Sequence, residues 1–122
     1  MISFIKGRFR SFKYAFRGSY LLLKTEHSIM TQVVIFSIVI FIGFYVGISK
    51  QDWINQTLAM GLVLGIEGMN TAVEKLADFV HEENHPKIGF IKDISAGAVT
   101  FAAFTFIIIL VITYYPYVLN LI

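Results

Sequence analysis

The fold is decided by residues 29–48, IMTQVVIFSIVIFIGFYVGI, a run of twenty positions without a charged side chain. At about 1.5 Å rise per residue, a helix of this length spans roughly 30 Å, the thickness of a bilayer core. A signal peptide fits less well, because no small-residue cleavage site follows a short apolar core. We therefore expect a transmembrane helix over residues 29–48.

Two further apolar segments follow on the C-terminal side. A polar turn at residues 49–52 leads into a segment at 53–80. The sequence at 84–89 has turn chemistry, and Pro86 should end any helix just before it. Residues 93–117 hold no charge after their first position. We expect transmembrane helices over 53–80 and 93–117.

The first 25 residues differ, because their apolar side chains recur every three or four positions, as on one face of a helix. This apolar face holds Ile2, Ile5, Phe9, Phe12, Phe16, Tyr20 and Leu23. A cationic stripe beside it holds Lys6, Arg10, Lys13 and Arg17. Such a helix lies in the headgroup plane with its cations near lipid phosphate. We expect residues 1–25 to form a surface helix, with a simple orientation anchor as the plainer alternative.

Composition favours one all-α integral membrane domain over residues 1–122. Hydrophobic residues make up 57% of the chain and charged residues 15%, against about 25% charged in soluble domains. The chain has no cysteine, which excludes disulfides and thiolate metal sites. We expect no nucleic-acid partner, because long apolar runs follow the basic N-terminal segment.

Lysine and arginine are distributed unevenly over the expected topology. Six of the ten lie in the first 24 positions, and three more, Lys75, Lys87 and Lys92, lie toward the second loop. Lys50 is then the one cationic residue on the opposite side. The positive-inside rule predicts a multi-pass protein with a cytoplasmic N-terminus and an external C-terminus.

Four polar residues share one face of the expected helix at 53–80: Glu67, Asn70, Glu74 and Asp78. At about 1.5 Å per residue, Glu67 lies within the inner leaflet and Glu74 near the cytoplasmic surface. A carboxylate inside the bilayer costs about 3 kcal/mol on insertion scales, so Glu67 marks a functional site by default. The structural alternative is a protonated Glu67 hydrogen-bonded to a neighbouring helix.

The side-chain types in this row suit phosphoryl transfer. Glu67 suits a general base for an alcohol at the lipid–water boundary, and Glu74, nearer the surface, suits a metal ion. An asparagine between two glutamates adds the hard oxygen ligands that a divalent cation and its polyphosphate need. A rival class is a small oligomeric transporter or channel subunit that uses Glu67 alone as a proton or cation site.

One short motif is misleading. The stretch His81-Glu-Glu-Asn-His85 matches the His-Glu-x-x-His pattern of zinc proteases. That chemistry needs both histidines one helical turn apart on one face, whereas Pro86 biases His85 away from helix. We do not expect a zinc protease. The chain also lacks a P-loop, so scattered side chains must hold any nucleotide.

The most specific motif is Glu67-Gly-Met-Asn-Thr-Ala-Val-Glu74, followed by Asp78 and by Lys92-Asp-Ile-Ser-Ala-Gly-Ala-Val99. Together with Ser11-Phe-Lys-Tyr-Ala-Phe-Arg-Gly18 and Glu26, the pattern covers nearly the whole chain. The sequence here resembles the prokaryotic diacylglycerol kinase family. The resemblance implies a homotrimer, with three transmembrane helices and an amphipathic surface helix per subunit. It also implies an ATP-dependent lipid kinase of the bacterial cytoplasmic (inner) membrane.

The resemblance further implies roles for individual residues. Glu67 would be the catalytic base acting on the lipid hydroxyl, and Asn70 would help to organise the site. Glu26 and Glu74 would hold the Mg²⁺ that bridges the ATP phosphates. Lys92 would stabilise charge on the transferring phosphoryl group. Further nucleotide contacts would come from Tyr14, Glu83, Asn84, His85 and Asp93.

The family contains two activities, on diacylglycerol and on undecaprenol. The run Ser95-Ala-Gly-Ala98 is more similar to the Ala-Ala-Gly-Ala of the undecaprenol type than to the Gly-Ser-Ala-Ala of the diacylglycerol type. By contrast, Glu26-His-Ser28 departs from the Glu-x-Asn of the undecaprenol branch. The sequence leaves both acceptors open.

Overall fold

The chain folds into four helices and no strand in a computed structural model that describes all residues, Met1–Ile122. The helices are α1 (Ile2–Thr25), α2 (His27–Val46), α3 (Lys50–Val80) and α4 (Pro86–Leu119). The all-helical class predicted from the sequence is therefore confirmed.

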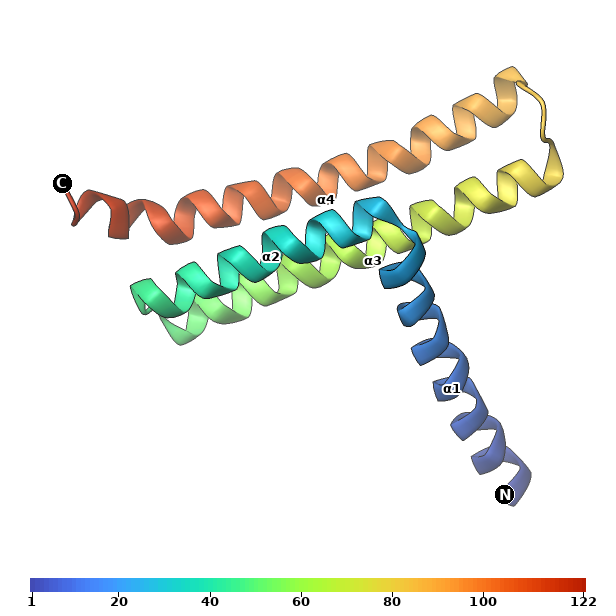
Figure 1. Cartoon of the computed structure of the whole chain (residues 1–122), viewed down its shortest axis with the longest axis horizontal. Coiled ribbons are helices and arrows are strands. Elements are labelled where there is room, and N and C mark those ends of the chain that lie inside the picture. The colour runs from blue at the N-terminus through green and yellow to red at the C-terminus, as the bar shows by residue number, and fades with distance from the viewer.

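Helices α2, α3 and α4 run antiparallel in turn and lie along one another (Figure 1). Contact is most extensive between α3 and α4, and α2 packs along α3. The common core includes Phe36 on α2, Met60 and Val63 on α3, and Phe106 on α4. The rings of Phe36 and Phe106 meet edge to face with centroids 4.9 Å apart, a favoured aromatic geometry. Because α2 is shorter than α3, the α3–α4 hairpin extends beyond the start of α2 (Figure 1).

The α2–α3 turn is fixed by two local features. Gly47 ends α2 with a φ of 75°, a left-handed conformation that glycine adopts without steric cost. Ser49 then caps α3, since its hydroxyl accepts from the Asp52 backbone N–H at 3.1 Å. Just before the turn, a Cβ on Gly43 would lie 2.9 Å from the Trp53 ring. Glycine at position 43 thus lets α2 and α3 approach closely.

Helix α4 begins at Pro86, whereas the sequence predicted its start at Asp93. Pro86 does end the preceding segment, but it also occupies the first turn of α4, where its missing N–H costs nothing. The ring of His85 caps this helix by accepting from the Lys87 backbone N–H at 3.1 Å. The predicted turn at 84–89 is therefore largely helical. The other two bundle helices begin earlier than predicted, α2 at His27 and α3 at Lys50.

Two of the helices, α2 and α4, are long and apolar enough to cross a bilayer. At about 1.5 Å per residue, the 34 residues of α4 extend roughly 51 Å, well beyond a bilayer core of about 30 Å. Helix α3 carries several charged side chains toward its C-terminal end. By length and apolar composition alone it is not a candidate membrane span.

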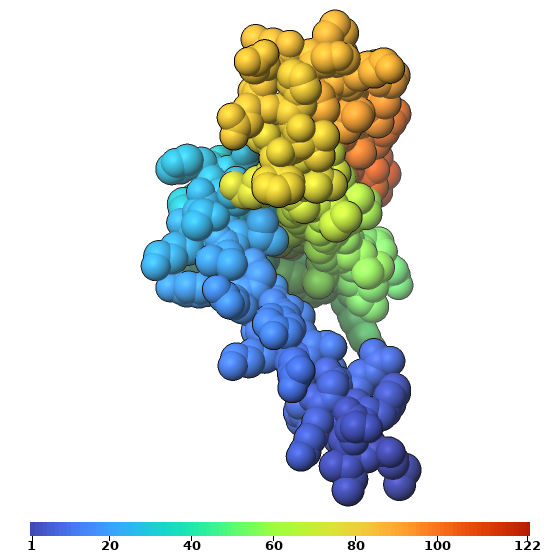
Figure 2. Space-filling model, turned by 90° about the vertical axis from the view of Figure 1, so that its right-hand side faces the viewer, coloured from blue at the N-terminus to red at the C-terminus, as the bar shows by residue number.

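Helix α1 projects away from the bundle, and none of its residues is buried within the chain (Figures 1 and 2). It joins α2 at Glu26, whose backbone is extended with φ −101° and ψ 112°. Two cations lie over aromatic rings of the same helix, Arg8 over Phe4 and Lys24 over Tyr20. The predicted helix at 1–25 therefore exists as Ile2–Thr25, with its apolar side chains uncovered by the rest of the chain.

One buried polar group lies in the half of the bundle near the α2–α3 turn, and we call it the Gln56 cluster: Gln56, Tyr114 and the Val39 carbonyl. The Tyr114 hydroxyl is 2.7 Å from Gln56 Oε1 and 3.3 Å from the Val39 carbonyl oxygen. Gln56 is fully buried, and its Nε2 has no partner. The cluster joins side chains of α3 and α4 to the backbone of α2.

Candidate active site

The polar face of α3 contains the carboxylates that the sequence singled out. Glu67 is 7% exposed and Asn70 8% exposed, whereas Glu74, one turn further on, is exposed. Asn70 Nδ2 donates to Glu74 Oε1 at 3.5 Å, and Asn70 Oδ1 is buried without a partner. A buried oxygen without a donor is costly, so it marks a place where a ligand can supply one.

Glu67 makes one side-chain hydrogen bond, and its partner was missed by the sequence analysis. Gln32 on α2 donates from Nε2 to Glu67 Oε2 at 3.5 Å, while Gln32 Oε1 is buried without a partner. A sequence feature that could have identified Gln32 is that it is a lone amide among the apolar residues of α2. It lies on the same helix face as the buried residues Ile29 and Phe36. We call Gln32, Glu67, Asn70 and Glu74 the carboxylate cluster.

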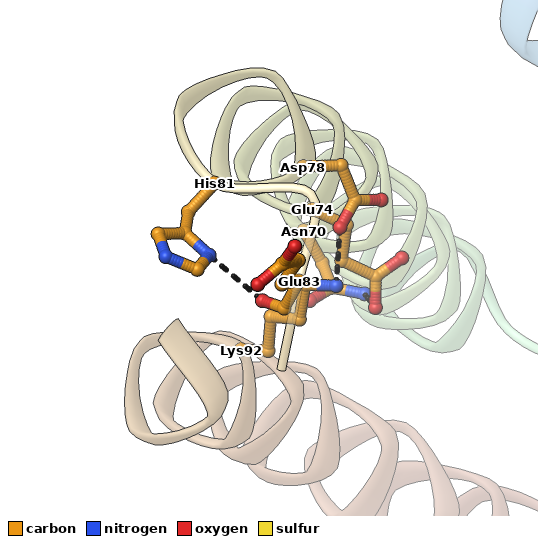
Figure 3. Close-up of polar contacts among 6 residues, drawn as sticks. All are labelled: Asn70, Glu74, Asp78, His81, Glu83 and Lys92. Atoms are coloured by element: carbon orange, nitrogen blue, oxygen red, sulfur yellow. Dashed lines mark hydrogen bonds and ion pairs between the residues drawn. The ribbon is translucent and has the colours of Figure 1, made fainter. Parts of the chain in front are cut away.

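Lys92 connects α4 to the end of α3. Its Nζ lies 2.5 Å from Asp78 Oδ1, and Figure 3 shows its side chain reaching across toward the α3 row that also holds Asn70 and Glu74. The ion pair joins Lys92 to Asp78, the α3 carboxylate nearest the loop. Both side chains remain partly exposed, so an incoming anionic ligand can compete for Lys92.

The loop between α3 and α4 closes a hollow of about 470 Å³ next to this ion pair. The walls include Asp78 and Lys92 as well as the loop residues His81, Glu82, Glu83, Asn84 and His85. Within the loop, the His81 ring contacts the Glu83 carbonyl through Nδ1 at 2.8 Å (Figure 3). Nine of the ten lining residues are polar, charged, glycine or proline, so the space suits a polar ligand.

The two histidines of the His-Glu-x-x-His pattern do not share a helix. His81 ends α3 with an extended backbone, and His85 caps α4. Their rings lie 5.3 Å apart, but both sit in the connecting loop. The helical geometry that a zinc protease needs is therefore absent at these residues.

Glu26 and Glu74, the predicted magnesium ligands, lie on different elements. Glu26 is at the α1–α2 junction, where its Oε1 pairs with Lys75 Nζ of α3 at 3.3 Å. No group of three or more acidic or histidine side chains is assembled for a metal within the chain. The donor set is nevertheless hard: two carboxylates plus the unpartnered Asn70 Oδ1. Oxygen donors of these types are the ones that Mg²⁺ takes together with substrate phosphates.

Two further predicted residues lie apart from this contact network. Asp93 follows Lys92 on α4 and is exposed, with no hydrogen bond or ion pair from its side chain to the other site residues. Tyr14 lies on α1, is 60% exposed, and does not line the loop hollow. The single chain thus places Lys92 and the loop at the end of the bundle where α3 finishes. Glu74, Asn70 and Glu67 follow along one face of α3 toward its middle, and Tyr14 lies apart on α1.

Comparisons with known proteins place the sequence in a family. A family model described as prokaryotic diacylglycerol kinase matches residues 13–114, from α1 to the far part of α4. The undecaprenol kinase of Bacillus subtilis (strain 168) is 34% identical over 105 residues, which cover 85% of this chain and 85% of that protein. Both the α3 carboxylates and the loop hollow fall inside the family match.

Proposed function

This chain belongs to the prokaryotic diacylglycerol kinase family and is a membrane kinase acting on lipid acceptors, and we propose that it phosphorylates undecaprenol with ATP. The observation that carries the proposal is the buried Glu67 in register with Asn70 and Glu74 on α3. A carboxylate at this depth meets a lipid hydroxyl, while the row beyond it leads to a polar hollow. Those are the two environments that a lipid kinase must join.

The packing and the charges support a particular membrane arrangement. We propose that α3 crosses the bilayer as the third span, because it packs along α4 and α2, the two helices that pass the test of composition. The N-terminus and the α3–α4 loop then face the cytoplasm of a bacterial inner membrane, as the distribution of cations favours. The exposed apolar surface is covered by lipid and by two further copies in a homotrimer.

In the proposed reaction Glu67 is the general base. Its carboxylate accepts the proton of the lipid hydroxyl while the lipid oxygen attacks the γ-phosphorus. The bond from that phosphorus to the β–γ bridging oxygen breaks, and ADP leaves with the electron pair. Lys92 stabilises the negative charge on the transferring phosphoryl group, since its ammonium is held beside α3 by Asp78 alone.

The proposed nucleotide site combines the loop hollow with the outer carboxylates. Glu83, Asn84 and His85 line the hollow and would contact the nucleotide, with Asp93 and Tyr14 completing the set. Glu26 and Glu74 would hold Mg²⁺, and Asn70 would orient Glu74 through its amide. When bound, the metal ion neutralises charge on the phosphates.

Undecaprenol is the acceptor that we favour. Its support is the B. subtilis undecaprenol kinase, which is 34% identical over 85% of both chains, together with the run Ser95-Ala-Gly-Ala98. Diacylglycerol offers the same chemistry, a hydroxyl at the membrane surface, and remains the comparison substrate.

The test is phosphate transfer from γ-labelled ATP by the purified full chain in detergent micelles with magnesium. Undecaprenol and diacylglycerol are offered in parallel at equal mole fraction. Faster transfer to undecaprenol supports the proposal, and faster transfer to diacylglycerol overturns the choice of acceptor. No transfer to either lipid by well-folded protein would contradict the proposed ATP-dependent reaction and favour Glu67 as a proton or cation site in a transporter.

A further inference from the structure

Gln32 is the residue through which α2 reaches the carboxylate cluster. Its Nε2 makes the one side-chain hydrogen bond that Glu67 receives, at 3.5 Å, across a separation of 35 positions in the chain. The bond is long, and the amide lies on the face of α2 that packs into the bundle. A polar amide on this face is costly unless it has a partner, so its presence needs an explanation.

The oxygen of the Gln32 amide suggests an explanation. Its Oε1 is buried and has no donor within the chain. A glutamine side chain carries a donor and an acceptor on one rotatable amide, whereas a carboxyl group changes from acceptor to donor when it takes up a proton. Gln32 can therefore bond Glu67 in both of its forms, through Nε2 when Glu67 is charged and through Oε1 when Glu67 is protonated.

We propose that Gln32 positions Glu67 throughout catalysis by rotating its amide as Glu67 gains and loses the substrate proton. This inference rests on the proposed function, because it takes Glu67 as the base. The lipid O–H bond breaks, its proton passes to a Glu67 oxygen, and its electron pair forms the new bond to phosphorus. Glu67 then donates to Gln32 Oε1 until the proton leaves to water, after which Nε2 again donates to the carboxylate.

Gln56 provides an internal comparison. Gln56 is fully buried in the bundle, whereas Gln32 is partly buried; both are held between helices, and each has one unpartnered amide atom. The side-chain contact of Gln56 is the Tyr114 hydroxyl rather than a carboxyl group, and the contact is short, at 2.7 Å. If the Gln32 amide were merely structural, replacing it should affect signals that report the protonation of Glu67 no more than replacing Gln56 does.

The experiment compares the full-length variants Gln32→Leu, Gln32→His and Gln56→Leu in the same phosphate-transfer assay. Leucine removes both hydrogen-bonding atoms, whereas a neutral imidazole keeps one donor and one acceptor. We expect Gln32→Leu to lower kcat about 10- to 100-fold, the effect of losing a hydrogen bond to a charged group, with KM for MgATP little changed. Gln32→His should keep most of the wild-type kcat. Full kcat in Gln32→Leu, or equal losses in the leucine and histidine variants, would overturn the proposal.

A second readout does not depend on turnover. Infrared difference spectra between acidic and neutral pH report the C=O band of protonated Glu67, identified as the band lost in Glu67→Gln. We expect this band to move to higher frequency in Gln32→Leu, because the acid loses its hydrogen bond, and to stay in place in Gln56→Leu. An unmoved band in Gln32→Leu, with the helical content of the wild type, would contradict the pairing.

The role of Glu67 as the base and the role of Gln32 in positioning it can be contradicted separately. If Glu67→Gln keeps full turnover, Glu67 is not the base, and both the proposed mechanism and the role of Gln32 are wrong. If Glu67→Gln is inactive while Gln32→Leu has wild-type kcat and an unmoved band, only the role of Gln32 is wrong.

Discussion

The bundle contains two polar clusters between its helices, and they differ in the lengths of their hydrogen bonds and in the atoms left without a partner. In the Gln56 cluster, Tyr114 donates at 2.7 Å to an uncharged amide oxygen, within reach of a backbone carbonyl, and one donor, Gln56 Nε2, has no partner. In the carboxylate cluster, both hydrogen bonds are 3.5 Å long, and two buried oxygens, Gln32 Oε1 and Asn70 Oδ1, have no donor. The first cluster therefore has the features of a structural contact between helices. The second has the features of a ligand-binding site, because its unpartnered oxygens can accept from a ligand.

The difference shows why polarity alone does not identify a site in a membrane bundle. Neutral side chains paired at short distance pack helices together for about 1 kcal/mol or less each. An ionisable side chain costs more to bury and is retained only where its charge is used. Loose contacts with unpartnered acceptors, next to an ionisable group, are the features that separate the carboxylate cluster from the Gln56 cluster.

The largest expected effect is that of Glu67→Gln. Removing a general base lowers rates by about 10²- to 10⁴-fold, so turnover should fall by at least about 10²-fold while the helical content stays unchanged. Steady-state phosphate transfer and circular dichroism check the two halves of this prediction. The matched control is Asp52→Asn, which removes a carboxylate near the α2–α3 turn and should keep normal turnover. Measurable turnover near the wild-type level in Glu67→Gln would remove Glu67 as the base.

Next in size is Lys92→Met. Loss of a positive charge at the transferring phosphoryl group should lower kcat about 100-fold, with a smaller effect on KM for ATP. Lys87→Met serves as the control, because Lys87 is an exposed cation in the first turn of the same helix. Initial rates over a range of ATP concentrations separate the two parameters. A rise in KM with unchanged kcat would make Lys92 a nucleotide-binding residue instead.

A smaller effect is expected from Glu74→Gln, which removes a proposed ligand but leaves the base in place. The magnesium concentration that gives half-maximal rate should rise about tenfold, as is usual when a metal site is weakened. Magnesium titrations of the variant and the wild type at saturating ATP measure this shift. Asp52→Asn, which removes a carboxylate near the α2–α3 turn and outside the proposed site, is the control. An unchanged magnesium requirement in Glu74→Gln would count against Glu74 as a ligand.

The smallest effect on turnover is expected in the Gln56 cluster. Tyr114→Phe removes the hydroxyl that joins α4 to Gln56, which should lower the free energy of unfolding by about 1 kcal/mol and change kcat less than about twofold. Unfolding of micelle-bound protein by added denaturing detergent gives the stability, and the transfer assay gives kcat. Tyr115→Phe alters an exposed tyrosine and should change neither. A large loss of kcat in Tyr114→Phe would mean that the Gln56 cluster also serves catalysis.

Much of the fold was predictable, because long apolar runs and a periodic amphipathic segment depend on local sequence. The four helices appear where the sequence expected them, apart from their ends. The predicted start of α4 was wrong because proline has two structural effects. It ends a helix that precedes it, and it is also favoured in the first turn of a helix that follows. Pro86 does both, with His85 as the cap.

The part of the candidate site that lies on a single helix, α3, was predictable from the sequence. Glu67, Asn70 and Glu74 share a face because of helical spacing alone, and the contact of Asn70 with Glu74 follows from that spacing. Contacts between helices were not predictable, because they depend on rotation and register. The pairing of Lys92 with Asp78, of Lys75 with Glu26, and of Gln32 with Glu67 all fall in this class.

The most direct test of the central claim is to measure turnover and stability together for Glu67→Gln and Tyr114→Phe in the same lipid micelles. Our account predicts a double separation: Glu67→Gln transfers no labelled phosphate yet unfolds like the wild type or later, whereas Tyr114→Phe transfers normally yet unfolds earlier. The account is contradicted if Glu67→Gln still phosphorylates lipid, or if both variants lose activity only in proportion to lost stability.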